Sequence, residues 1–366
     1  MTESPLPSFE GPVCPVPLRH SDRVVLGHGS GGKLSHDLIA RVFLPRFANP
    51  ALLANNDAAL VQPAGDLRLA ISTDAHVVWP LLFAGGDIGR LAVCGTVNDV
   101  AMLGATPLYI TAGFILEEGL ELDLLERVVA SMQAAAAEAA IQIVAGDTKV
   151  VQRGKADGLY ITTAGVGLVR PDVAIGGENA RPGDLVILSG PIGDHGIAVL
   201  EARGELGFSS NISSDVAPLN HLIAAMLDGT QAEAGSQTEC SPAIHVLRDP
   251  TRGGVATSLN EIAQQSQVCI VLEESKVPIR APVAAACEML GFDPLYVANE
   301  GKLIAIVRRE AAAQVLQAMH STRYGEEAVI VGEVREAPKG RVLMKTAIGS
   351  SRVVDVLAGE MLPRIC

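Results

Sequence analysis

Aromatic residues and long hydrophobic runs are scarce in this sequence. Phe, Trp and Tyr make up 3% of its 366 residues while 48% are hydrophobic, so we expect a core of Ala, Val, Leu and Ile. The chain has no run of about 18 apolar residues, which predicts the absence of a membrane-spanning helix. Its start lacks a charged segment followed by an apolar one, the pattern of a secretory signal. We therefore expect a cytoplasmic protein.

Basic residues and paired cysteines are also lacking. Lys and Arg number 28 against 41 Asp and Glu, a net charge of −13, which argues against a nucleic-acid partner. None of the 6 cysteines forms a Cys-x-x-Cys pair, so neither a zinc site nor a redox dithiol is indicated. Without an export signal, disulfides are not expected. We expect buried or incidental thiols, except at Cys366, the last residue of the chain.

Helix and strand patterns alternate along the chain, which predicts an α/β (α+β) fold. We expect a loose proline-rich segment over 1–20, a first domain over 21–169, a second α/β domain over 170–357 and a mobile tail over 358–366. Hydrophobic patterns in the first domain predict a strand at 23–26, a helix at 33–44 ended by Pro45, and a strand at 52–57.

A glycine-rich loop precedes the first expected helix. Residues 27–33 fit the G-x-x-x-x-G-K pattern of a P-loop, but Leu34 stands where that motif needs a Mg²⁺-binding Ser or Thr. A P-loop ATPase is therefore disfavoured, while consecutive amides at a helix start remain suited to phosphate oxygens. A plain tight turn is the alternative. The candidate phosphate-binding residues are Gly29, Ser30, Gly31 and Gly32.

Acidic residues follow several apolar runs in the first half of the chain. Mg²⁺ prefers oxygen ligands, and nucleotide enzymes supply carboxylates together with phosphate oxygens. A single Asp at such a position is more often a helix cap or a turn residue, but a set of them beside a phosphate-type loop predicts a metal site. The candidate ligands are Asp57, Asp74, Asp99 and Asp147.

Three further charged positions are candidates for chemistry. Lys149, just after Asp147 and Thr148, could bind phosphate or stabilise developing negative charge, or could be a solvated turn residue. Glu300 could be a general base or an exposed turn residue. A charged turn around Asp249 leads into two glycines at a helix start. His28 and His195, in glycine-rich loops, are second-tier candidates.

The terminal thiol of Cys366 would sit on a tether. About ten extended residues span roughly 33 Å, so the thiol could visit more than one site. A thiolate is a strong nucleophile and a covalent carrier. A prenylation signal would need the Cys four residues from the end, so that interpretation is excluded. The remaining alternative is that a cysteine stands at the last position by chance.

Several of these segments together resemble the family of the hydrogenase maturation factor HypE over nearly the whole chain. The last four residues, Pro-Arg-Ile-Cys, are the most specific; the others are shared more loosely with PurM-like ATP-binding proteins such as aminoimidazole ribonucleotide synthetase. The segments that carry the resemblance are 28–32, 85–89, 94–99, 146–151, 248–254, 299–301 and 363–366.

The resemblance implies a two-domain PurM-like ATP-binding fold with a homodimer formed by the first domain. It implies ATP and Mg²⁺ near the junction of domains and subunits, with Asp99, Thr148, Asp249 and the glycine loop on the nucleotide. A partner, HypF, would load a carbamoyl group onto Cys366, and ATP would activate its oxygen so that dehydration leaves a thiocyanate. Glu300 would be the base and Lys149 would stabilise charge. The cyano group would pass to iron on HypC–HypD, for nickel–iron hydrogenase.

Three alternatives differ from this hypothesis. A selenophosphate synthetase would need no such terminus and would carry a reactive Cys beside a Lys near its start, whereas Cys14 lies between Val13 and Pro15. A non-enzymatic thiol carrier would show no ATP hydrolysis that depends on the loaded thiol. A P-loop ATPase is weakened by Leu34.

Overall fold

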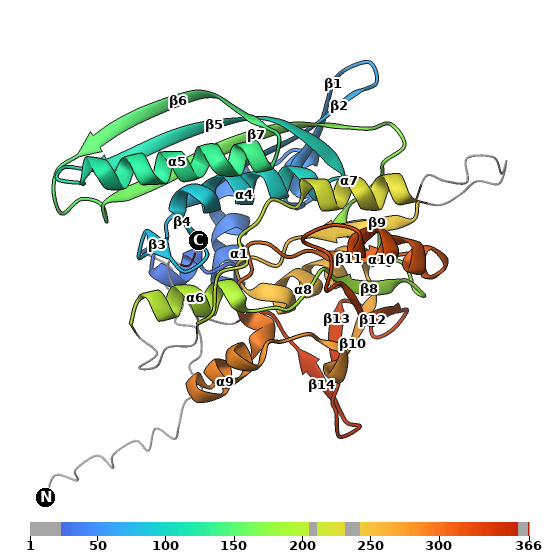
Figure 1. The fold of residues 1–366 in the computed structure, drawn as a ribbon. Coiled ribbons are helices and arrows are strands. Elements are labelled where there is room, and N and C mark those ends of the chain that lie inside the picture. The colour runs from blue at the N-terminus through green and yellow to red at the C-terminus, as the bar shows by residue number, and fades with distance from the viewer. Residues whose placement is uncertain (1–22, 205–210, 231–241, 358–364, 366) are drawn as a thin grey trace, which may run out of the picture.

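The computed structural model describes residues 23–204, 211–230, 242–357 and 365, and within them the chain builds two main β-sheets with flanking helices (Figure 1). This confirms the expected mixed α/β class. The expected loose segment 1–20 and most of the expected tail, including Cys366, lie outside the described residues.

The first sheet has the order β1-β2-β7-β5-β6, with all neighbours antiparallel except the parallel pair β5 and β6. Two helices, α4 (Ile88–Ala101) and α5 (Leu122–Glu138), pack against one of its faces. Asp87 starts α4, because its Oδ1 accepts the backbone N–H groups of Gly89 and Arg90. The strands are β1 (Ala59–Ala64), β2 (Leu67–His76), β7 (Leu159–Val169), β5 (Ala105–Glu117) and β6 (Gln142–Val151).

The second sheet is seven-stranded within the described residues and has the order β14-β13-β10-β12-β8-β11-β9. Its strands are β14 (Ser351–Val354), β13 (Arg341–Lys345), β10 (Cys269–Glu273), β12 (Val329–Arg335), β8 (Leu185–Leu188), β11 (Ile304–Val307) and β9 (Ile244–Arg248). The helices that accompany it are α6 (Asp194–Ala202), α7 (Asn220–Gly229), α8 (Gly254–Ser266), α9 (Ala281–Leu290) and α10 (Ala312–His320). A shared apolar cluster joins the two units, since Val100 and Met102 pack in one core with Ile187, Leu222 and Ala305.

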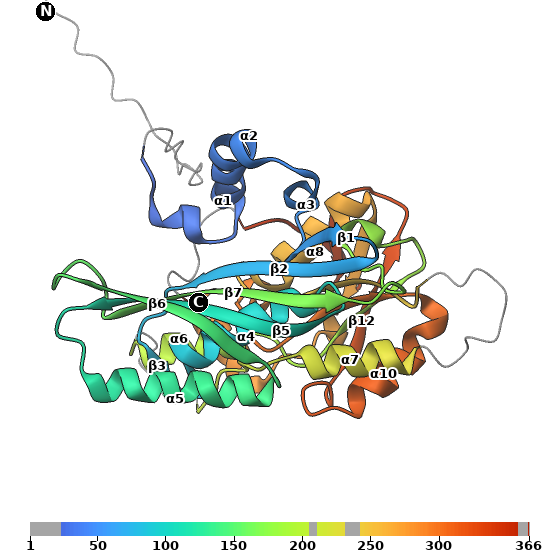
Figure 2. The same cartoon turned by 90° about the horizontal axis from the view of Figure 1, so that it is seen from above.

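Short helices precede the first sheet and lie on the side opposite α5 (Figure 2). They are η1 (Leu26–Gly29), α1 (Lys33–Leu38), the π-turn η2 (Ile39–Phe43), α2 (Leu44–Phe47) and α3 (Pro50–Leu53). A hairpin of two short strands, β3 (Leu82–Phe83) and β4 (Gly86–Asp87), leads into α4. No helix among the described ranges has the length and apolarity needed to cross a membrane.

Three local expectations were wrong. Residues 23–26 form no strand, and Leu26 instead begins η1. The expected helix 33–44 is interrupted by η2 and then continues to Phe47, because Pro45 sits in the first turn of α2, where proline needs no N–H partner. The expected strand 52–57 does not form, and its first two residues are instead the end of helix α3. The Asn49 side chain caps that helix by accepting from the N–H groups of Ala51 and Leu52.

Candidate functional site

A cluster of carboxylates gathers where the two sheet units meet. Asp57 precedes β1, Asp74 lies on β2 and Asp99 lies on α4, all in the first unit. From the second unit come Asp249, just after β9, and Glu300, just before β11. The electrostatic coupling among the five shows that they are close neighbours. Acids from both halves of the sequence therefore share one site.

Burial and mutual repulsion both act on these acids. Burial raises the pKa of Asp99 well above its ordinary value, and repulsion from Asp249, Asp74 and Asp57 raises it further. The pKa of Asp249 is raised in the same way, first by burial and then by Asp57. Glu300 is 4% exposed, and its raised pKa follows from burial and from repulsion by Asp249 and Asp74. Glu300 is thus not an exposed turn residue.

Arg248 is a buried cation beside this cluster. Its Nη1 donates to Asp57 Oδ1 at 2.7 Å and lies 3.6 Å from Glu261 Oε2. Arg248 lowers the pKa of Asp57, but burial outweighs it, so the pKa of that carboxyl is still raised. Arg252, which lies near Glu300, lowers the pKa of that carboxyl as well, yet the pKa values of Asp57 and Glu300 both stay raised, so the two guanidinium groups offset only part of the acidic charge.

Two acceptors in the cluster have no hydrogen-bond partner within the described part of the chain. They are Asp249 Oδ2 and Glu300 Oε1, and both are buried. Buried polar atoms are normally satisfied, so orphaned ones point to an absent ligand, ion or water. A cavity of about 290 Å³ reaches Asp249, Asp57 and Arg248. This cavity is where a ligand could meet the acids.

The glycine-rich loop borders the same cavity. Gly29 and Gly31 line it, and Gly31 has a φ of +75° with an added Cβ falling 2.9 Å from the Cβ of Arg252. Ser30 stabilises the turn by donating from Oγ to Gly27 O at 2.9 Å. Gly32 is pressed against the backbone of Leu357 instead. The loop therefore presents backbone to the cavity at two of the four predicted positions.

Lys33 does not behave as a P-loop lysine. Its Nζ lies 3.2 Å from Asp355 Oδ2 in an exposed ion pair, away from the cavity lining. The residue that precedes the loop belongs to a 3-10 turn rather than to the strand that a P-loop follows. Both observations agree with the missing hydroxyl at Leu34.

Within one chain, three of the predicted site residues lie apart from the acidic cluster. Asp147, Thr148 and Lys149 lie on β6, where they are exposed. Lys149 Nζ bonds Asp147 Oδ2 at 2.7 Å, and this pairing lowers the pKa of Asp147. Among the residues that the structure describes, β6 pairs only with β5, which leaves its other edge open. Of the four predicted metal ligands, the structure brings together Asp57, Asp74 and Asp99.

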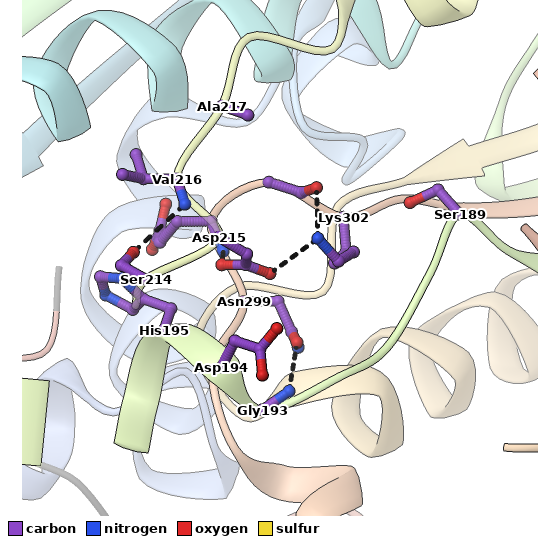
Figure 3. Close-up of polar contacts among 12 residues, drawn as sticks. Ser189, Gly193, Asp194, His195, Ser214, Asp215, Val216, Ala217, Asn299 and Lys302 are labelled. Atoms are coloured by element: carbon purple, nitrogen blue, oxygen red, sulfur yellow. Dashed lines mark hydrogen bonds and ion pairs between the residues drawn. The ribbon is translucent and has the colours of Figure 1, made fainter. Parts of the chain in front are cut away.

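A network of polar groups holds the backbone of Glu300. Its N–H donates to Asp215 Oδ1 at 3.0 Å, and Asp215 Oδ2 lies 3.4 Å from Lys302 Nζ (Figure 3). The preceding Asn299 side chain accepts from Gly193 N at 2.7 Å, which joins this loop to the start of α6. Glu300 is therefore carried on a rigid frame.

Sequence reasoning missed several members of the site. Arg248 stood beside Asp249 in the sequence, but its partner Asp57 is 191 residues away. His76 lies buried with Nε2 3.7 Å from Asp74 Oδ2, and burial lowers its pKa. Asp215 sits in a segment without a recognisable motif. Only the pairing of distant segments reveals these contacts.

The described residues contain no group of three or more His, Cys, Asp or Glu side chains arranged to hold a metal ion by themselves. The clustered carboxylates are therefore not a complete protein-only cage. Sites for Mg²⁺ in nucleotide enzymes commonly use one or two carboxylates and take their remaining ligands from phosphates and water. The cluster fits that incomplete kind of site.

Family models match most of the chain. Residues 55–169 match the AIR synthase related protein N-terminal domain, and residues 181–345 match the corresponding C-terminal domain. A carbamoyl dehydratase HypE from Cupriavidus necator is 52% identical over 347 residues, covering 94% of this chain and 95% of that relative.

Solved structures agree with the sequence relatives. A crystal structure of a HypE–HypF complex is similar with a TM-score of 0.81 at 47% identity, covering 87% of this chain and 99% of that one. A structure of the hydrogenase maturation protein HypE in complex with ATP has a TM-score of 0.76 at 49% identity, covering 94% and 100% of the two chains.

Proposed function

Because the chain belongs to the HypE family of carbamoyl dehydratases, we propose that it uses ATP to dehydrate a carbamoyl group carried on its own terminal cysteine, Cys366. The observation that carries this proposal is the buried acidic cluster that includes Glu300, in which Asp249 has an unpartnered oxygen and lines a cavity that the glycine loop also borders. The ATP complex of a similar protein supports ATP as the co-substrate.

In the proposed reaction, the carbamoyl oxygen attacks the γ-phosphorus of ATP and ADP leaves. The N–H protons and the phosphorylated oxygen are then lost, so that S–C(=O)–NH₂ and ATP become S–C≡N, ADP and inorganic phosphate. Phosphorylation is needed because hydroxide is a poor leaving group. Phosphoryl transfer itself demands mainly positioning and cationic charge.

Glu300 is the proposed base that removes the nitrogen protons. Its raised pKa makes the carboxylate a stronger proton acceptor, and its unpartnered Oε1 is available to take a proton. The frame of Asp215 and Asn299 fixes its backbone. We propose that Lys149 stabilises charge on the carbamoyl group, a role that needs β6 to approach the site.

A divalent cation fits the acidic cluster. Asp57, Asp74 and Asp249 raise the pKa of Asp99, and Asp57 also raises that of Asp249, so a cation between these carboxyls would relieve their repulsion. We propose that these residues hold Mg²⁺ together with the phosphates of ATP, with Gly29 and Gly31 facing the phosphates through their backbone. The ion would neutralise charge on the transferring phosphoryl group.

We propose a homodimer formed through the first sheet. The open edge and faces of β6 expose Val144 and Val150, together with Asp147, Thr148 and Lys149. Apolar residues exposed in a row on one strand favour a partner surface. A second copy would place its Asp147, Thr148 and Lys149 near the nucleotide of the first copy. Within a single chain these residues lie apart from the acidic cluster.

The partners proposed for this cytoplasmic enzyme follow from its relatives. A similar protein was crystallised with HypF, so we propose a HypF-type carbamoyltransferase as the donor of the carbamoyl group. We propose that the thiocyanate then supplies the cyanide ligands of hydrogenase iron through a HypC–HypD complex.

The test is the intact mass of the protein after incubation with HypF, carbamoyl phosphate and ATP. We expect one carbamoyl adduct on Cys366 that loses one water only when the nucleotide can be hydrolysed. Cys366→Ala should gain no adduct yet bind ATP normally. Glu300→Gln should be loaded but not dehydrated.

Other results would redirect the proposal. A loaded thiol that never loses water would support the non-enzymatic carrier. The absence of any adduct would point to a small-molecule substrate, as in a selenophosphate synthetase.

A further inference from the structure

The residue next to the terminal cysteine is buried inside the protein. Ile365 is 4% exposed and packs in one apolar cluster with Phe83, Val216 and Ala298. Its carbonyl oxygen lies 2.8 Å from Nε2 of His195, which is itself fully buried near the start of α6. A backbone carbonyl at the chain end thus meets a side chain 170 residues away.

The hydrogen bonds around His195 define its tautomer. A carbonyl can only accept, so Nε2 must carry the proton that it donates to Ile365 O. Burial lowers the pKa of His195, which favours the neutral ring, and Nδ1 is then an acceptor. Ser214 Oγ, 2.8 Å away, donates to Nδ1 and accepts from Val216 N at 3.1 Å. Every polar atom of the ring is therefore satisfied, and the donor points at the chain end.

The ring plane is also held by packing. Phe83 meets His195 edge to face, with ring centroids 5.5 Å apart and an interplanar angle of 85°. Phe83 belongs to the same apolar cluster as Ile365. The contact with Phe83 and the hydrogen bond from Ser214 therefore both fix the direction of the Nε2–H bond.

Hydrogen bonds link both His195 and Glu300 to the segment 213–217, of which Figure 3 labels Ser214 to Ala217. The segment 213–217 supplies Ser214 to His195 and Asp215 to the N–H of Glu300. The segment 298–300 carries Glu300, and its Ala298 carbonyl accepts from Gly196 N, in the first turn of α6, at 3.2 Å. His195 and the loop that carries Glu300 therefore belong to one hydrogen-bonded network.

We propose that His195 is the anchor of the chain terminus, a positioning residue whose Nε2–H holds the Ile365 carbonyl and so sets the carbamoylated thiol of Cys366 in register with Glu300. This inference rests on the proposed function and adds a residue role to it. The anchor consists of one neutral hydrogen bond and one apolar side chain. Such a hold is modest, which suits a terminus that must also be released for loading by another protein.

The first test measures docking without any turnover. Iodoacetamide reacts with Cys366 in the intact protein, and peptide mass spectrometry quantifies that residue separately from the other thiols. We expect His195→Leu to speed alkylation of Cys366 by roughly fivefold to tenfold, the effect of losing one buried hydrogen bond. His195→Gln, which can still donate at the Nε2 position, should restore part of the protection.

Two further variants control this test. Ser214→Ala removes the group that fixes the tautomer, so Nε2 is no longer held as the donor and an intermediate alkylation rate is expected. His221→Leu changes an exposed histidine on α7 and should match the unaltered protein. Thermal unfolding of each variant checks the fold. Equal alkylation of Cys366 in His195→Leu, Ser214→Ala and the unaltered protein would overturn the proposal.

The second test separates loading from dehydration. With HypF and carbamoyl phosphate, His195→Leu should gain the carbamoyl adduct at the normal rate and bind ATP normally. Its rate of water loss should fall by tenfold or more, with partial rescue in His195→Gln. Normal dehydration by His195→Leu would refute the positioning role.

The two proposals can fail independently. If the unaltered protein never dehydrates its adduct but His195 still protects Cys366 from alkylation, the dehydratase proposal fails and the anchor survives. If dehydration proceeds and both His195 variants leave it unchanged, only the anchor fails.

Discussion

At the residue scale, the acids of the site are held in an unfavourable environment. Burial and repulsion both raise the pKa of Asp99, and Ser72 Oγ donates a hydrogen bond to it at 2.6 Å without cancelling those effects. Like charges gathered in a buried place reduce folding stability unless a ligand compensates them. Neutralising one of these acids should therefore raise the folding stability of the nucleotide-free protein and weaken its binding of Mg–ATP.

Asp99→Asn tests this opposition. Asn keeps an acceptor for Ser72 but cannot ionise in the unfolded chain, so the melting temperature of the nucleotide-free protein near neutral pH should rise by a few degrees, about 1 kcal/mol. Affinity for Mg–ATP, measured by calorimetry, should fall about tenfold or more. A variant that loses both stability and affinity would show that Asp99 has a structural role instead.

The difference in folding stability between Asp99→Asn and the unaltered protein should change with pH in a definite direction. Below about pH 4 the carboxyl of Asp99 is protonated in both the folded and the unfolded chain, so the two proteins should be equally stable. As the pH rises, the unfolded Asp99 ionises while its raised pKa keeps the folded one protonated, which favours unfolding. The advantage of Asp99→Asn should therefore grow with pH and level off above the raised pKa. Melting curves at several pH values measure it, and an advantage largest at low pH would contradict the assignment.

At the element scale, β6 is the exposed strand of the first sheet. In the described part of the chain, hydrogen bonds tie it to β5 on one side only, and Val150 is 68% exposed while Lys149 and Asp147 pair beside it. A strand so placed is normally covered or blocked in a soluble protein. The proposed homodimer would cover it.

Val150→Glu should therefore weaken the homodimer without unfolding the chain. A charge on an apolar contact surface is costly to bury, whereas in the single chain this side chain already faces solvent. Analytical ultracentrifugation should show a dissociation constant raised at least tenfold, with unchanged melting of the monomer. Ile348→Glu is the matched control, because Ile348 is 90% exposed in the turn between β13 and β14 and should leave assembly unchanged.

A largely buried ion pair crosses the junction between the two units. Asp57 belongs to the first unit and Arg248 to β9 of the second, and both side chains are largely buried. Removing one partner of such a pair leaves an uncompensated buried charge.

Arg248→Met should lower the free energy of unfolding by about 3 kcal/mol at neutral pH, measured by urea denaturation. The double variant Arg248→Met/Asp57→Leu should regain most of that loss, because it also removes the buried Asp57 carboxylate that Arg248→Met leaves unpaired, while Glu261 keeps its contact with His36. Additive losses in the double variant would mean that the two residues stabilise the protein independently.

At the scale of the whole molecule, the sequence predicted the mixed α/β class. The apolar runs at 159–169 and 185–188 became β7 and β8, because a continuous or alternating apolar pattern has few other ways to be buried. The segments 23–26 and 52–57 were misjudged because a local cap and a turn outweighed short apolar runs.

The sequence by itself determined which chemical groups the protein has: a glycine loop, acids after apolar runs, and a terminal thiol. These depend on residue type and local spacing, which can be read along one chain. Only the tertiary structure decided which of them meet. It joined Asp57 to Arg248, buried Glu300, placed His195 against Ile365, and left Asp147 and Lys149 on an exposed strand. Such pairings depend on how the two sheets pack across distant segments, and that packing is a property of the whole fold.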